Sequence, residues 1–226
     1  MLDRFTNQGA GLIGLGCQLG PRLVAMVSHG DEQAELPLLW QLCLSLVNFG
    51  YSVTVLDATT EESEANPGLK QLLKNAHSGE DSLRDSSAWT VLASAQGLQS
   101  LIRNVQTQSR SLQQLGPLMP AEGIVVLYCK VDWMTELIGD QFAEPLLAVS
   151  PNRKSLLTGY IALKRLLITG KLKPTIVNMD QEPNRLGSAG LPTASAGLGE
   201  CAKRFLGREL KTLHITDQQP DIAPCE

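Results

Sequence analysis

The 226-residue chain is predicted to form an α/β domain in which a doubly wound, mostly parallel sheet of about seven strands has helices on both faces. Two observations support this fold class. Short, continuous apolar runs such as GIVVLYC and PTIVNM are typical of strands that are buried on both faces. Segments with helical periodicity separate many of these runs, and such alternation is typical of a doubly wound sheet.

The expected strands and helices alternate along most of the chain and are separated by glycine, proline and polar turn residues. They define one domain over residues 21–217, which follows an N-terminal segment (1–20) and precedes a tail (218–226) whose prolines predict flexibility. The expected strands span residues 22–28, 51–57, 88–94, 123–129, 144–149, 174–178 and 211–216, and the expected helices span residues 36–48, 97–115, 153–169 and 197–209.

The segment 36–48 is predicted to be a helix that is buried over a wide arc, because its polar residues form one narrow stripe and all the others are apolar. Pro37 suits the first turn of this helix, where a missing N–H costs little, and Gly50 suits its C-terminal cap. The polar stripe consists of Gln41, Ser45 and Asn48.

The segment 153–169 has one apolar helical face. Leu156, Tyr160, Leu163 and Leu167 recur along it at spacings of four, three and four residues. We expect this face to pack on the sheet and not to bind a cofactor.

The composition excludes several classes of function. A net charge of −4 and 4% aromatic residues argue against a nucleic-acid-binding surface. The five cysteines include no C-x-x-C pair, which favours a reducing compartment. Neither the cysteines nor the three histidines show metal-ligand spacing. Cys43 and Cys129 lie in apolar runs and are expected in the core. The start MLDRFTNQGAG does not resemble a signal peptide, and no apolar run reaches the about 18 residues of a membrane span. We therefore expect a cytoplasmic protein that binds no nucleic acid and no metal.

The stretch VSHGDEQAEL connects the first expected strand to the first expected helix, where such folds often have a phosphate-binding loop. A phosphate loop needs glycines, which let backbone N–H groups point at the anion, and a lysine. This stretch has one glycine, no lysine and three acids, which repel a triphosphate but are favourable at an empty helix N-terminus. We therefore expect no nucleotide binding by the degenerate loop, which consists of Gly30, Asp31, Glu32, Gln33, Ala34 and Glu35.

The order of these segments resembles that of the MinD/ParA group of P-loop ATPases from about residue 22 to residue 221. The stretch LCLSLVNFGYSVTVLDAT resembles the group's pattern L-x-L-x-L-x-x-x-G-x-x-V-x-x-L-D-A-D. When the two are aligned there, the group's K-G-G-V-G-K-T-T motif falls on residues 30–37, with Glu35 at the position of the lysine and Leu36 at that of the threonine. The stretches LLAVSPNRKSLLTGYIALKRLL and CAKRFLGRELKTLHITDQQPD resemble later parts of MinD-like proteins. The resemblance implies a SIMIBI-type P-loop fold.

The resemblance also implies that catalytic positions have changed. The first aspartate of D-A-D is kept as Asp57, but Thr59 replaces the second, which helps to position the attacking water in such ATPases. Tyr128 stands at the acid position of a later strand, and Asn178 matches an asparagine near the nucleotide base. We therefore expect no catalytic residues, no cofactor and no ATPase activity, with Asp57 and Asn178 as remnants of a nucleotide site.

Within this group, the flagellar-number regulators (FlhG, also called FleN or YlxH) carry an N-terminal D-Q-A-x-x-L-R motif that stimulates the GTPase FlhF. Residues 7–13 read NQGAGLI, in which Gln8 and Leu12 match the motif and Asn7 replaces its aspartate. The two glycines each disfavour a helix by about 1 kcal/mol, so this helix would form only against a partner. The resemblance implies an FlhF-type GTPase as partner and Asn7, Gln8 and Leu12 as partner-binding residues; the alternative is a chance match.

MinD-like proteins usually end in an amphipathic, membrane-binding helix, whereas this chain ends in DQQPDIAPCE. We therefore expect no direct membrane anchor and, without nucleotide, a monomer. Three functions remain open: a non-hydrolysing regulator of flagellar number or placement, a pseudo-ATPase scaffold of another machine such as cellulose secretion or partitioning, and an active ATPase with an unorthodox loop. The acidic stretches 31–35 and 61–64 are also compatible with a solvated rim.

Overall fold

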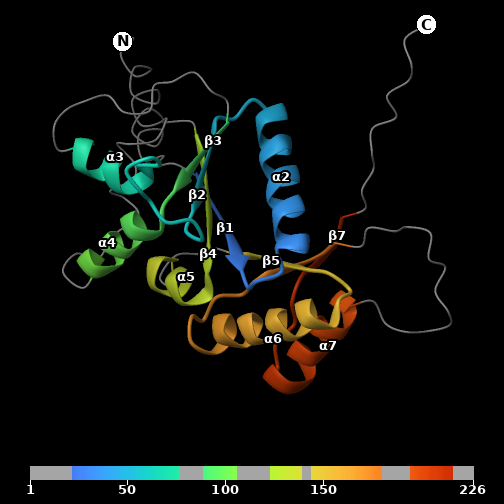
Figure 1. Cartoon of the computed structure of the whole chain (residues 1–226). Helices are drawn as coiled ribbons and strands as arrows, with labels where there is room; N and C mark the ends of the chain where they lie inside the picture. The colour runs from blue at the N-terminus through green and yellow to red at the C-terminus, as the bar shows by residue number, and fades with distance from the viewer. Residues whose placement is uncertain (1–21, 77–88, 106–122, 139–143, 180–193, 216–226) are drawn as a thin grey trace, which may run out of the picture.

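A seven-stranded, all-parallel sheet forms the centre of the structure, a computed structural model (Figure 1). The strands are β1 (Arg22–Ser28), β2 (Val53–Asp57), β3 (Trp89–Ala93), β4 (Ile124–Lys130), β5 (Leu146–Val149), β6 (Thr175–Asn178) and β7 (Thr212–His214). Their order across the sheet is β3-β2-β4-β1-β5-β6-β7. The sequence-based prediction of the fold class is confirmed, and every strand lies within two residues of its expected bounds.

The structure describes only part of the chain. Asn7, Gln8 and Leu12 and the tail 218–226 lie outside the described residues, so the predictions made for them stay predictions. The described residues are 22–76, 89–105, 123–138, 144–179 and 194–215.

The described helices cover the two faces of the sheet unequally (Figure 1). They are α2 (Glu32–Asn48), α3 (Gly68–Ala76), α4 (Ala95–Val105), α5 (Val131–Ile138), α6 (Arg153–Ile168) and α7 (Ala194–Leu206). Apolar side chains of α3 to α7 join one large core on one face of the sheet. On the other face, α2 is the only described helix, and it packs against side chains of β1, β2, β4, β5 and β6.

The central strand β1 marks the point where the order of the strands changes direction. It pairs with β4 along its whole length and contacts β5 at Met26 and Leu146. Strands β2 and β3 lie beyond β4, whereas β6 and β7 lie beyond β5. In open α/β sheets, ligands bind at the carboxyl ends of the strands at such a switch point. The C-terminal end of β1 is therefore the place where this fold would hold a ligand.

Several sequence-based helix boundaries were wrong. Helix α2 begins at Glu32 and not at residue 36, so Pro37 lies inside the helix and not in its first turn. Helices α3 and α5 were not predicted. Helix α5 was missed because it follows β4 without an intervening loop, in the apolar stretch IVVLYCKVDWM. The cap at Gly50 is confirmed: it takes φ +85° and donates its N–H to the carbonyl of Val47 at 2.8 Å.

The prediction that α2 is buried over a wide arc is wrong. Leu36, Trp40 and Leu44 follow one another at four-residue spacing and are 49%, 59% and 44% exposed. The reason is that no other described helix packs beside α2 on its face of the sheet. The helix therefore presents an apolar row that the described residues leave open.

Cys43 and Cys129 are confirmed as core residues, and each is fully buried. Burial raises the pKa of the Cys43 thiol to about 11 and also raises that of Cys129. Since the thiolate is the reactive form, we expect a thiol reagent at pH 8 to label the partly exposed Cys201 well before either of them. Peptide mass spectrometry of briefly labelled native protein measures this order, and early labelling of Cys43 would contradict the buried position.

Candidate functional site

The chain turns from β1 into α2 through only three residues, His29, Gly30 and Asp31, which we call the β1–α2 turn. Gly30 takes φ +92°, a left-handed conformation that favours glycine. Because α2 begins at Glu32, residues 32–35 form a helical turn at positions where the family resemblance places the phosphate loop. The turn is thus shorter than a G-x-x-x-x-G-K phosphate loop.

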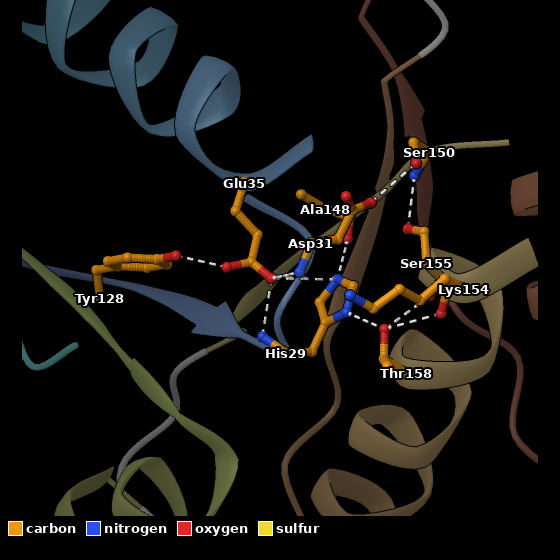
Figure 2. Close-up of polar contacts among 9 residues, drawn as sticks. All are labelled: His29, Asp31, Glu35, Tyr128, Ala148, Ser150, Lys154, Ser155 and Thr158. Carbon is orange, nitrogen blue, oxygen red and sulfur yellow. Dashed lines mark hydrogen bonds and ion pairs between the residues drawn. The ribbon is translucent and has the colours of Figure 1, made fainter. Parts of the chain in front are cut away.

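The Glu35 side chain is fully buried and points back toward the β1–α2 turn (Figure 2). Its Oε1 accepts the backbone N–H of His29 at 2.8 Å and that of Asp31 at 2.9 Å. Its Oε2 accepts the hydroxyl hydrogen of Tyr128 at 2.5 Å. Backbone N–H groups at a helix N-terminus are the donors that bind phosphate in nucleotide-binding loops. Here a carboxylate of the same chain takes two of them.

Two further N–H groups of the same region are bonded inside the helix. Ala34 and Glu35 donate to the carbonyl oxygen of Asp31 at 3.0 and 2.9 Å. Four of the seven backbone N–H groups from His29 to Glu35 therefore have an acceptor within the chain.

The His29 ring lies between α2, β5 and α6 (Figure 2). Its Nε2 is 2.7 Å from the carbonyl oxygen of Ala148 and 3.6 Å from Oε1 of Glu35, and its Nδ1 is 2.8 Å from Oγ1 of Thr158. Because a carbonyl only accepts, Nε2 must carry a hydrogen. The ring is 2% exposed, so it holds these elements together and is not available to a bound molecule.

Asp31 connects the β1–α2 turn to Ser150, the residue that follows β5. It occupies the N-cap position of α2, but its carboxylate does not cap the helix. Oδ2 of Asp31 accepts the hydroxyl hydrogen of Ser150 at 2.8 Å, and the N–H of Ser150 donates to Oγ of Ser155 at 2.9 Å. Hydrogen bonds thus connect the β1–α2 turn with the residue that follows β5 and with the first turn of α6.

Tyr128 donates the side-chain hydrogen bond to the buried Glu35 carboxylate. It is 3% exposed, and its pKa is raised, first by burial and then by its hydrogen bond to Glu35. The phenol therefore stays protonated and acts as a donor at neutral pH. A buried charge is tolerated when hydrogen bonds replace water, and Glu35 has three of them. The residues at the lysine and aspartate positions of the family resemblance thus contact each other directly.

The two predicted remnants of a nucleotide site are not brought together. Asp57 accepts hydrogen bonds from the Thr59 N–H at 2.8 Å and hydroxyl at 2.6 Å and from the Thr60 hydroxyl at 2.7 Å, so it stabilises a local turn. Asn178 is buried at the end of β6, with Nδ2 3.4 Å from Nδ1 of His214. Strands β4, β1 and β5 lie between β2 and β6.

The solvated-rim interpretation is wrong for three of the acids, because Glu35 is 0%, Glu62 is 7% and Asp31 is 9% exposed. Glu62 accepts the N–H groups of Gln96 at 2.6 Å and Gly97 at 2.8 Å at the N-terminus of α4. A carboxylate is favourable there because of the helix dipole.

Sequence reasoning missed the roles of His29, Ser150 and Thr158. One sequence signal could have pointed to the contact between Glu35 and Tyr128: Glu35 falls at the lysine position, and Tyr128 at an aspartate position, of the motifs that the chain resembles. Among the described residues, no three His, Cys, Asp or Glu side chains are grouped so that they could hold a metal ion. None of the helices described is long and apolar enough to span a membrane.

Comparison with known proteins gives one weak structural similarity. No family model matches the chain, and no curated protein does. Among solved structures, the MinC:MinD cell division protein complex from Aquifex aeolicus is similar, with a TM-score of 0.39 and 11% identity over 86% of this chain and 100% of that chain. A similarity this weak supports no statement about function.

Proposed function

We propose that this chain is a non-hydrolysing, MinD-like regulatory protein that acts by binding another protein. The proposal rests on the Glu35 carboxylate, which accepts the N–H groups of His29 and Asp31 where a phosphate would need them. A nucleotide phosphate in the same place would have to displace a buried negative charge or lie next to it. Repulsion between such charges is strong in surroundings that water does not screen.

The electrostatics of the helix N-terminus support the same conclusion. The dipole of a helix offers only about half a positive charge at this end. Glu35 and Glu32 lie in the first turn of α2, and Asp31 precedes them at 9% exposure. The positive end of α2 is therefore already balanced by side chains of the chain itself.

An exposed apolar surface supports binding to a protein. This α2 surface consists of the exposed Leu36, Trp40 and Leu44 of α2 with the half-buried Trp89 and the exposed Val91 of the edge strand β3. The Trp40 and Trp89 rings pack with their centroids 4.6 Å apart, and Val91 is 57% exposed. Contiguous apolar surface with aromatic side chains is typical of protein interaction sites, and α2 contains no lysine or arginine that would favour an acidic partner.

We further propose that the partner is an FlhF-type GTPase and that the protein controls flagellar number or placement. This finer assignment rests on the resemblance of residues 7–13 to the activator motif. The GTP turnover of such a GTPase is expected to rise when the full chain is added and to stay at its basal rate with Gln8→Ala. Gln18→Ala, in the same N-terminal segment, is the matched control and should behave as wild type. An unchanged turnover with wild-type protein would reject the flagellar assignment and leave the binding proposal standing.

Calorimetric titration with ATP and ADP in the presence of magnesium tests the absence of nucleotide binding. We expect no heat and no thermal stabilisation at millimolar nucleotide. A site with a Kd a hundredfold below the nucleotide concentration would stabilise the protein by about 2.7 kcal/mol, which thermal melting detects easily. Binding at micromolar concentration would overturn the proposal, and the protein would then have to be treated as a nucleotide switch.

A further inference from the structure

The outer side of α6 carries a second exposed apolar row. Leu157, Ile161 and Ile168 are 62%, 48% and 58% exposed. At 3.6 residues per turn they point within about 40° of one another. The opposite side of the helix packs into the large core, so these three side chains do not contribute to that packing. Figure 1 shows α6 on the outside of the sheet beside α7.

Cations flank this row on both sides. Helical geometry places Arg153 and Lys164 along one edge of the row and Lys154 and Arg165 along the other, and all four are exposed. Arg165 also pairs with the exposed Asp132 of α5 at 3.2 Å. Two more exposed lysines, Lys171 and Lys173, follow the helix.

The positive charge is local. Residues 145–179 contain six lysines and arginines and no aspartate or glutamate, whereas the whole chain has a net charge of −4. The α2 surface has the opposite character, because α2 has glutamates in its first turn and no basic residue. The two apolar surfaces are therefore suited to different partners.

We propose that this α6 face, Leu157, Ile161 and Ile168 with the cations beside them, rests on a membrane surface that contains anionic lipid. In helices that lie in the membrane interface, apolar side chains enter the boundary of the acyl chains while lysines and arginines extend to the headgroups. A row with cations on both edges places positive charge over headgroups on both sides of the inserted residues. The proposal differs from the sequence-based expectation of no direct membrane anchor, and it does not depend on the function proposed for the α2 surface.

The contact is expected to be weak and reversible. Three partly exposed side chains insert little apolar area, so attraction between the cations and anionic headgroups supplies much of the affinity. Such attraction is screened by salt. An acidic amphipathic helix of a partner protein would need a carboxylate row on each edge of the apolar row, whereas an anionic leaflet offers negative charge in every direction.

Sedimentation of the full chain with lipid vesicles tests this proposal. We expect binding to phosphatidylcholine vesicles that contain about a third phosphatidylserine, little binding to phosphatidylcholine alone, and loss of binding as salt is raised. Two double variants are used: one combines Lys154→Glu with Lys164→Glu, and the other combines Leu157→Ser with Ile161→Ser. Each should lower the partition coefficient of the protein between vesicles and water at least about tenfold. These side chains are exposed, so both double variants should keep the wild-type circular dichroism and thermal midpoint.

The matched controls change exposed residues elsewhere on the protein. Lys74→Glu with Lys130→Glu alters the net charge equally, and Val91→Ser removes an exposed apolar side chain of the α2 surface. Both are expected to bind vesicles like wild type. Failure of the wild type to sediment with phosphatidylserine vesicles, or equal loss in the controls, would overturn the proposal. Capture of an acidic protein that depends on Leu157 and Lys164, without vesicle binding, would overturn it in favour of a protein partner.

Discussion

Glu35→Ala is expected to lower the free energy of unfolding by about 3–5 kcal/mol, because it leaves buried donors without their acceptor. The donors are the N–H groups of His29 and Asp31 and the hydroxyl of Tyr128. The His29 ring would also lose the carboxylate that lies 3.6 Å from its Nε2. Urea unfolding followed by circular dichroism, extrapolated linearly to water, measures the loss.

Glu32→Ala is the matched control, since Glu32 lies in the same helical turn but is exposed. Its effect should stay within about 0.5 kcal/mol. A small carboxylate such as acetate should stabilise Glu35→Ala more than wild type, because the variant offers free N–H donors that the anion can bind. A loss below about 1 kcal/mol for Glu35→Ala would mean that water replaces the carboxylate at little cost, contrary to the burial described above.

Tyr128→Phe is expected to lower the free energy of unfolding by about 1.5–3 kcal/mol at pH 7, the range for a hydrogen bond to a charged group. The variant keeps the ring in the core and leaves Oε2 of Glu35 without this donor. Tyr51→Phe is the control: its hydroxyl makes an exposed contact with Arg22, and its loss should stay within about 0.5 kcal/mol. If the losses from Glu35→Gln and Tyr128→Phe simply add in the double variant, the two residues are not coupled.

The same tyrosine predicts a pH dependence. Burial and the hydrogen bond to Glu35 raise the pKa of Tyr128 in the folded protein. Its contribution to stability is therefore complete below the unfolded pKa of about 10 and is lost as the pH rises above it. The difference in unfolding free energy between wild type and Tyr128→Phe should narrow as the pH is raised beyond about 10. A constant difference would show that the phenol is not held in its neutral form.

These experiments bear on how the protein would be controlled. In the proposed function, the carboxylate that fills the β1–α2 turn belongs to the chain and cannot be released by hydrolysis. The α2 surface would then be presented to a partner at all times, and regulation would depend on the amount of protein or on its location. Binding at the α6 face would supply a location, and the two surfaces can be changed independently by mutation.

The sequence by itself determined the α/β class and the seven strands. Buried parallel strands need continuous apolar runs, and this pattern is local enough to read from stretches such as IVVLYC. The absence of a lysine from the β1–α2 turn was equally plain. Helix ends were less well determined, because the limit between β4 and α5 lies inside one apolar stretch and the start of α2 lies among acids that suit both a turn and a helix.

Only the tertiary structure decided which groups the Glu35 side chain contacts and which surfaces stay open. Glu35 and Tyr128 are 93 residues apart, and His29 and Thr158 are 129 apart, so their contacts depend on the order of the strands and not on local pattern. Apolar periodicity likewise shows which residues can be buried, but not whether a neighbouring element is present to bury them. For that reason Leu36 and Trp40 on α2, and Leu157 and Ile161 on α6, were identified as exposed only when the packing of all the described helices was known.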